Sequence, residues 1–159
     1  MLISPEALAI VGGAIALAGG LAGSSIGIGI AGSAGAATLS EEPGQLRNVI
    51  LLASLPMTQT FYGLITLILV LTRVVDRLGA MTDGGGLGLA VLGIGILTAA
   101  AEAFSGAYQG SVCASGISLL PKTKGRILTN SMMLAVFVEL IGVFGLVFAI
   151  MSFALLGLF

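Results

Sequence analysis

The chain has 159 residues, of which 57% are hydrophobic and 8% are charged, and its formal net charge is −1. Since a soluble domain carries about 25% charged residues, this composition excludes an ordinary water-soluble protein. A net charge this close to zero gives no indication of a nucleic-acid partner. A chain with no His and one Cys is also a poor candidate for a zinc or copper site.

Long runs with few or no charges divide the sequence into segments that could cross a membrane. Each run is longer than the roughly 20 residues that a helix needs to span the bilayer core. The runs are Ala7–Ser40, Asn48–Thr72, Gly84–Pro121 with Glu102 as its one charge, and Ile127–Phe159 with Glu139 as its one charge. The N-terminus before the first run has no basic residue, so we expect a retained helix rather than a cleaved signal peptide.

These runs predict an all-α membrane protein with four transmembrane helices. Short segments of alternating polarity, as in a membrane β-barrel, are absent from the sequence. The predicted helices cover about residues 6–39, 47–76, 86–120 and 126–158.

Charged, turn-forming stretches connect the helices and pair them into two hairpins, residues 1–78 and 79–159. The halves resemble one another, with "SSIGIGIAGSAGAATL" matching "SGAYQGSVCASGISLL" and Gln59 falling opposite Glu139, so we predict a duplicated hairpin. Basic residues are more frequent in the loops inside the hairpins than in the connection between them. This bias predicts a multi-pass protein of the cell membrane with cytoplasmic hairpin loops and both termini on the outer side. The two groups are Arg47, Lys122, Lys124 and Arg126 against Arg73 and Arg77.

Small residues recur at every fourth position of the first and third predicted helices. Such a stripe lets helix backbones approach closely within a membrane. We expect these helices to form a tight inner layer and the aromatic-rich second and fourth helices an outer layer. A homo-oligomeric ring is favoured over one isolated four-helix bundle. The glycines expected to pack the ring are Gly19, Gly23, Gly27, Gly35, Gly106 and Gly110.

Glu139 is the central feature of the fourth helix. A carboxylate inside a membrane is costly unless it is neutralised, and it marks a functional site by default. No Lys or Arg lies within any predicted helical core. Glu139 must therefore be neutralised by a proton, a metal cation or a basic group of another protein.

Neutral oxygen donors accompany this carboxylate. Thr58 and Gln59 lie opposite it in the repeat, and Gln109 lies at mid-depth in the third helix. One carboxylate with neutral oxygens balances a single positive charge and suits a hard cation, so the set fits Na⁺ or H⁺. Alternatively, each glutamine could serve only as a hydrogen-bond partner between helices, without binding an ion.

Pro56 and Tyr62 are candidate supporting residues. Pro56 lacks an N–H, which frees a carbonyl near Leu52 and loosens the backbone around Leu55. A carbonyl turned out of the helix can bind an ion, although a simple kink is the alternative. Tyr62 could hydrogen-bond Glu139 or could act only in packing.

Two other residues have no assigned role. Glu102 could line a pore lumen, lie near the membrane surface, or tune the site, and the sequence does not select among these. Cys113 is expected to be a small packing residue, and a lone cysteine permits no disulfide within the chain.

Three motifs occur together in the chain: "LPMTQTFYG", "FSGAYQG" and "VELIGVFG". With them the chain resembles, along nearly its whole length, the proteolipid (K or c) subunit of the V-type and A-type rotary ATPases, in particular the sodium-pumping bacterial branch. This resemblance implies a Na⁺ site made by the Leu55 carbonyl, Thr58, Gln59, Gln109 and Glu139, with Tyr62 holding Glu139. The family pattern has a small residue where this chain has Glu102.

The resemblance further implies that copies of the chain form a rotor ring that carries ions across the membrane. Implied partners are further copies, lipid, a stator subunit that supplies an arginine, and a central-stalk subunit at the cytoplasmic loops. The phosphate-binding motif Gly-x₄-Gly-Lys-Ser/Thr is absent, so the chain is not expected to hydrolyse ATP itself. The alternatives are a proton-carrying ring, a free-standing ion transporter or channel, and a purely structural membrane oligomer.

Overall fold

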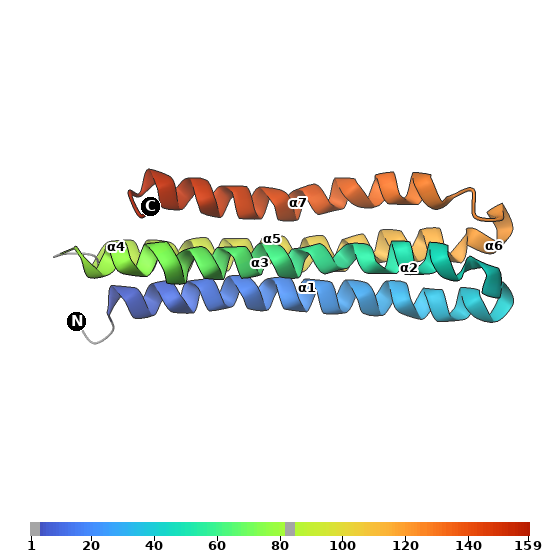
Figure 1. The fold of residues 1–159 in the computed structure, drawn as a ribbon, viewed down its shortest axis with the longest axis horizontal. Coiled ribbons are helices and arrows are strands. Elements are labelled where there is room, and N and C mark those ends of the chain that lie inside the picture. The colour runs from blue at the N-terminus through green and yellow to red at the C-terminus, as the bar shows by residue number, and fades with distance from the viewer. Residues whose placement is uncertain (1–3, 82–84) are drawn as a thin grey trace.

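The computed structural model describes residues 4–81 and 85–159, and all of the regular secondary structure within them is helical. Four rods run side by side along one long axis, with both termini at one end and the hairpin connections at the other (Figure 1). The elements are α1 (Pro5–Glu41), η1 (Pro43–Gln45), α2 (Leu46–Ser54), η2 (Leu55–Met57), α3 (Thr58–Leu69), η3 (Val70–Val74), α4 (Val75–Gly79), α5 (Gly85–Ser118), α6 (Leu120–Thr123) and α7 (Leu128–Leu155).

Among the described residues, three single helices are long and apolar enough to cross a membrane: α1, α5 and α7. The second predicted segment, 47–76, is instead a succession of shorter pieces, α2 to α4, which together form one rod (Figure 1). A 3₁₀ turn at η2 and a π-helical turn at η3 divide this rod. The structure therefore shows three uninterrupted helices of membrane-spanning length, and the second predicted helix is an interrupted rod that stays a predicted span.

Pro56 explains the first interruption. It has no N–H to offer the Leu52 carbonyl, and the N–H of Leu55 bonds that carbonyl instead. The N–H of Thr58 then bonds the carbonyl of Leu55, one residue closer than in an α-helix. The Leu52 carbonyl is thus not left free as expected, because the tighter turn uses it.

The glycine stripe of α1 provides close approach within the chain. The contact between α1 and α5 is the most extensive of any pair of elements. A methyl group added at Gly23 would lie 2.8 Å from the Ala103 Cα, and one at Gly106 would lie 2.5 Å from the Gly23 carbonyl carbon. No side chain fits between these backbones, which is the arrangement that small-residue stripes permit in membranes.

All six glycines predicted to pack the ring are used in this way. Each one meets another element of the same chain: α2 at Gly35, α5 at Gly19, Gly23 and Gly27, and α1 at Gly106 and Gly110. These contacts all lie within one chain, and packing between copies of the chain stays a prediction.

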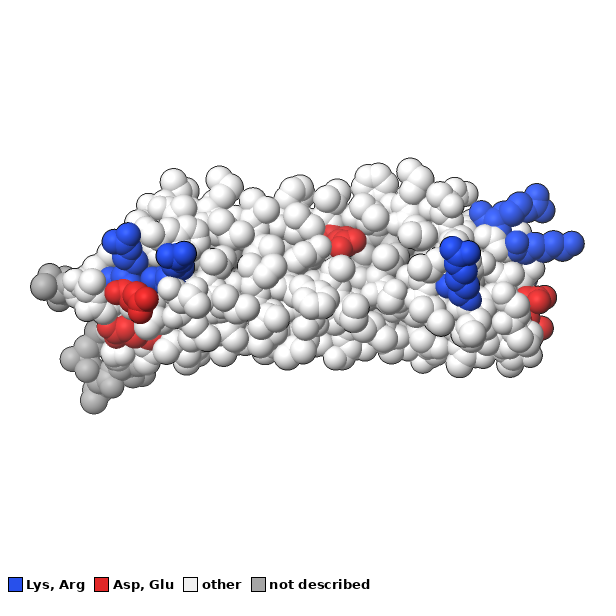
Figure 2. Space-filling view, viewed as in Figure 1, with Lys and Arg blue, Asp and Glu red and all other residues white. Residues whose placement is uncertain are grey.

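The outer surface of α7 is strongly apolar. Phe137 is 67% exposed, Phe144 62% and Leu155 84%. On the face shown in Figure 2, Lys and Arg gather at the two ends, and a single acidic patch lies between them. A surface with an apolar middle and charged ends fits a bilayer environment.

Candidate ion-binding site

Glu139 lies at mid-length on α7, among the outward-facing residues of that helix. It is partly exposed, whereas its neighbours Phe137, Leu140 and Ile141 are exposed. Unlike Glu102, the other mid-span carboxylate, Glu139 is not fully buried. The carboxylate is thus placed where an ion could reach it from the side of the bundle.

Two side chains from other helices hold this carboxylate. The Tyr62 hydroxyl on α3 donates to Oε1 of Glu139 at 3.0 Å, and Nε2 of Gln109 on α5 donates to Oε2 at 3.3 Å. Gln109 is fully buried and also donates to the Ala135 carbonyl at 3.4 Å. These bonds fix both oxygens of Glu139 from opposite sides.

The polar network continues from Gln109 into the second rod. Nε2 of Gln59 donates to Oε1 of Gln109 at 3.1 Å, and Gln59 is fully buried. Thr58 Oγ1 lies 3.3 Å from Gln59 Oε1 and 3.3 Å from the Leu55 carbonyl oxygen. Both separations exceed the usual O–H···O range of about 2.5–3.0 Å. Three oxygens therefore lie close together here without a tight hydrogen bond among them.

The structure thus joins the five predicted ligands and Tyr62 in one connected group. The interruption of the second rod at Pro56 orients the start of α3, because Pro56 is buried against α1, beside Gly27. The residues brought together are Leu55, Thr58, Gln59, Tyr62, Gln109 and Glu139.

Ser105 is a member of the network that the sequence interpretation missed. Its hydroxyl donates to the Val138 carbonyl at 3.0 Å and accepts from Gln59 Nε2 at 3.1 Å. It lies one helical turn before Gln109, on the same face of α5, which is the signal that could have identified it.

Glu102 is placed in the interior. Its side chain is fully buried, and neither carboxylate oxygen has a hydrogen-bond partner among the described residues. This placement removes two of the three options left open by the sequence, because a fully enclosed side chain neither lines a lumen nor lies at the membrane surface.

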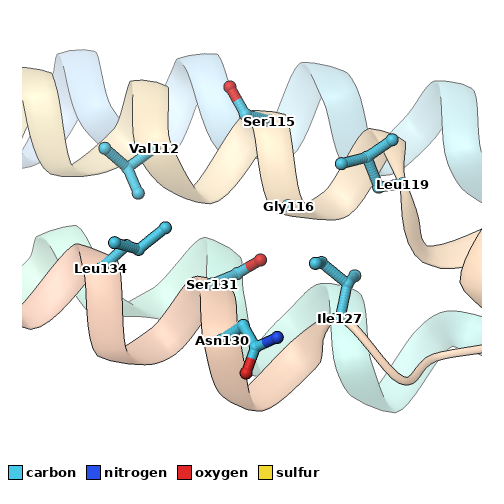
Figure 3. A pocket seen from close by; sticks show the side chains of 8 residues that line it. All are labelled: Val112, Ser115, Gly116, Leu119, Ile127, Asn130, Ser131 and Leu134. Atoms are coloured by element: carbon cyan, nitrogen blue, oxygen red, sulfur yellow. The ribbon is translucent and has the colours of Figure 1, made fainter.

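The groove in Figure 3 is a different feature. It has a volume of about 300 Å³ and lies between the later part of α5 and the beginning of α7. Val112, Ser131 and Leu134 are among its lining residues, and none of the predicted ligands is. The ion site is therefore a cluster of converging oxygens rather than this groove.

The chemistry available at the cluster is that of a small hard cation. It offers one carboxylate, two amide oxygens, a hydroxyl and a carbonyl, and no basic side chain lies in the same part of the helices. Such a set can neutralise one positive charge. The described residues contain no group of three or more His, Cys, Asp or Glu side chains, the arrangement that transition metals and Ca²⁺ favour.

Comparison with known proteins decides the family. The family described as the C subunit of ATP synthase matches the chain twice, over residues 11–70 and 92–152. The chain belongs to this family. One match falls in each half, so the family's domain is duplicated, as the internal repeat predicted. As a member of this family, the chain is an ion-carrying membrane proteolipid of the V/A-type rotary ATPases and does not itself catalyse ATP hydrolysis.

Two relatives are similar over most of the chain. It is 32% identical to "V-type sodium ATPase subunit K" of Enterococcus hirae over 125 residues, which is 79% of this chain and 76% of the relative. It is 35% identical to "A-type ATP synthase subunit K" of Methanocaldococcus jannaschii over 150 residues, 94% of this chain. The aligned region covers 63% of that longer protein.

Proposed function

We propose that each chain binds one Na⁺ at Glu139 and carries it across the membrane as part of a rotating ring. Five groups coordinate the ion: the Glu139 carboxylate, the side chains of Thr58, Gln59 and Gln109, and the Leu55 carbonyl. Tyr62 positions the carboxylate. The ion enters between Glu139 and the three oxygens around Thr58, and its charge cancels that of the carboxylate.

One observation carries the choice of a metal ion over a proton. Thr58 Oγ1 lies 3.3 Å from both the Leu55 carbonyl oxygen and Gln59 Oε1, too far for tight hydrogen bonds but suited to ligands that share one ion. A proton on Glu139 needs only one acceptor, whereas a hard metal cation uses several oxygens such as these. The Enterococcus hirae relative, named as a sodium ATPase subunit, supports the same ion.

The ring would work by exchanging the ion at a stator. A charge-neutral, loaded Glu139 can face lipid because the apolar surface of α7 surrounds it. An arginine of the stator subunit would displace Na⁺ and pair with the carboxylate until the ion is replaced. The hairpin loops, with their excess of basic residues, would face the cytoplasm and meet the central stalk. The two hairpins, about residues 1–78 and 79–159, act as one unit because only the second has the carboxylate.

A carbodiimide reagent tests the ion assignment, since it modifies a protonated carboxyl group in an apolar environment. Na⁺ bound at Glu139 should exclude the proton and slow the modification in a saturable way, whereas K⁺ at the same concentration should not. Modification of Glu139 at a rate independent of Na⁺ would favour a proton-carrying ring. Ion flux through the purified chain alone in liposomes would favour a free-standing transporter or channel.

A further inference from the structure

Glu102 on α5 is a buried acid that the site described above does not use. Its side chain is 0% exposed, and both carboxylate oxygens lack a hydrogen-bond partner among the described residues. A carboxylate buried without a partner is strongly disfavoured in its ionised form. Among the described residues, the other mid-span ionisable side chains are Tyr62, Tyr108, Cys113 and Glu139, none of them basic. Glu102 therefore needs a bound cation of its own.

Two glycines of α7 make the space that this carboxyl group occupies. A methyl group added at Gly142 would lie 2.7 Å from Oε2 of Glu102 and 3.1 Å from the Ser105 hydroxyl oxygen. One added at Gly145 would lie 3.3 Å from Oε1 of Glu102 and 2.7 Å from the Ala101 Cβ. A side chain at Gly142 would therefore displace the acid, and the acid and the Ser105 hydroxyl share one small compartment.

Ser105 connects this compartment to the ion site. The Ser105 hydroxyl group donates its hydrogen to the Val138 carbonyl, and one lone pair of its oxygen accepts a hydrogen bond from Gln59 Nε2. A hydroxyl oxygen has a second lone pair, which is available to a further donor. A protonated Glu102 is such a donor, and it would end a chain of polar groups that begins at Glu139 and passes through Gln109 and Gln59.

A proton fits this compartment better than a metal ion does. A hard metal cation requires several oxygen ligands, and the atoms nearest the space at Gly142 include only two oxygens, Oε2 of Glu102 and the Ser105 hydroxyl oxygen, beside the Cγ of Gln59. Thr98, one turn earlier on α5, already donates its hydroxyl hydrogen to the Ile94 carbonyl. A proton needs only the single acceptor that Ser105 provides.

We propose that Glu102 is a second cation-binding carboxyl group in each chain, which holds a resident proton and donates it in a hydrogen bond to Ser105. Its complete burial keeps it out of reach of the stator, so this proton stays while the ion at Glu139 is exchanged. Glu102 is then a positioning residue: it fixes Ser105 and, through it, the amide of Gln59. The inference rests on the proposed function, because it makes Gln59 a ligand whose orientation matters.

Infrared spectroscopy of the intact complex tests the proposal through the carbonyl stretch of protonated carboxylic acids. With saturating Na⁺, one such band per chain should persist in the wild type and in Glu139→Gln, and it should disappear in Glu102→Gln. Absence of a persistent band in the wild type, or its survival in Glu102→Gln, would overturn the proposal. The wild-type measurement does not depend on whether a variant folds.

The affinity and stoichiometry of Na⁺ binding distinguish the remaining outcomes. Glu102→Gln retains a donor for Ser105 and should bind Na⁺ with nearly wild-type affinity, whereas Glu102→Leu should bind it at least several-fold more weakly with the same stoichiometry. Equal affinities for Glu102→Leu and the wild type would overturn the positioning role. A second Na⁺ per chain that is lost in Glu102→Gln would overturn the resident proton. If Na⁺ fails to protect Glu139 but the Glu102 band persists, the sodium assignment fails and the resident proton stands.

Discussion

The Tyr62 hydroxyl on α3 lies 3.0 Å from Oε1 of Glu139 on α7, and it joins the second predicted segment to the fourth. These residues are 77 positions apart in the sequence. The bond satisfies one carboxylate oxygen and turns the other toward Gln109 and the remaining oxygens. Glu139 is thereby held in one orientation before an ion arrives, which reduces the entropy that binding must overcome.

Tyr62→Phe should weaken Na⁺ binding without disturbing the fold. The hydrogen bond to the charged Glu139 is worth about 1.5–3 kcal/mol, and because it is already present in the ion-free chain, only part of this energy is lost from binding. We therefore expect a roughly tenfold loss of affinity. The measurement is the Na⁺ concentration that half-protects Glu139 from a carbodiimide.

Tyr108→Phe is the matched control, because Tyr108 is 63% exposed and stacks on Phe104. It should behave as the wild type does. Equal protection of the Tyr62→Phe and wild-type proteins would show that the hydroxyl does not position the carboxylate.

Pro56→Ala should separate stability from ion binding. Alanine restores an N–H that can bond the Leu52 carbonyl, so the 3₁₀ turn can relax toward α-helix and thermal stability should not fall. The Leu55 carbonyl and Thr58 would then rotate out of place, and because two ligands are displaced, Na⁺ affinity should fall by roughly tenfold or more. Calorimetry and sodium titration of the same sample check both parts. If the Na⁺ affinity of Pro56→Ala is unchanged, Pro56 only kinks the rod and does not position the ligands.

Gly27→Ala should destabilise the chain, because the added methyl group would collide with the Gly106 carbonyl oxygen and the ring of Pro56. Overpacking of this kind costs about 1–3 kcal/mol, and we expect a lower unfolding temperature and less protein in the membrane. Gly29→Ala, two residues away on α1, is the comparison: a Cβ there meets nothing within 4 Å in the chain. A loss at Gly29 as large as that at Gly27 would contradict the use of the stripe within the chain.

The proposed orientation can be tested with an amine reagent that does not cross membranes. The two lysines of the chain, Lys122 and Lys124, both lie in the loop between α5 and α7. If that loop is cytoplasmic, mass spectrometry should find them modified in inverted vesicles and unmodified in intact cells. The reverse pattern would place both termini in the cytoplasm instead.

The sequence was sufficient to predict the helical architecture, because apolar runs of this length have few alternatives in lipid. It did not reveal that the second segment is interrupted twice. Pro56 indicates the first interruption in the sequence. The residues of η3, "VLTRV", include none that would predict the π-helical turn there. The glycine stripe predicted close approach but not its partner, which depends on how the helices pack together.

The candidate site was predictable in its residues but less so in its connections. Glu139 was evident because no basic residue accompanies it. Ser105 was overlooked because serines in membrane helices commonly bond the carbonyl four residues earlier, as Ser111, Ser115 and Ser118 do here. Sequence alone does not distinguish such a serine from one that bonds to a neighbouring helix. The position of Glu102 likewise became clear only when Gly142 and Gly145 of α7 were found opposite it.

Equilibrium binding of radioactive sodium to the purified complex tests most directly whether each chain holds one Na⁺ at Glu139. We expect one saturable Na⁺ per chain in the wild type and none in Glu139→Gln. Saturable binding that survives in Glu139→Gln, or no saturable binding in the wild type, would contradict this expectation.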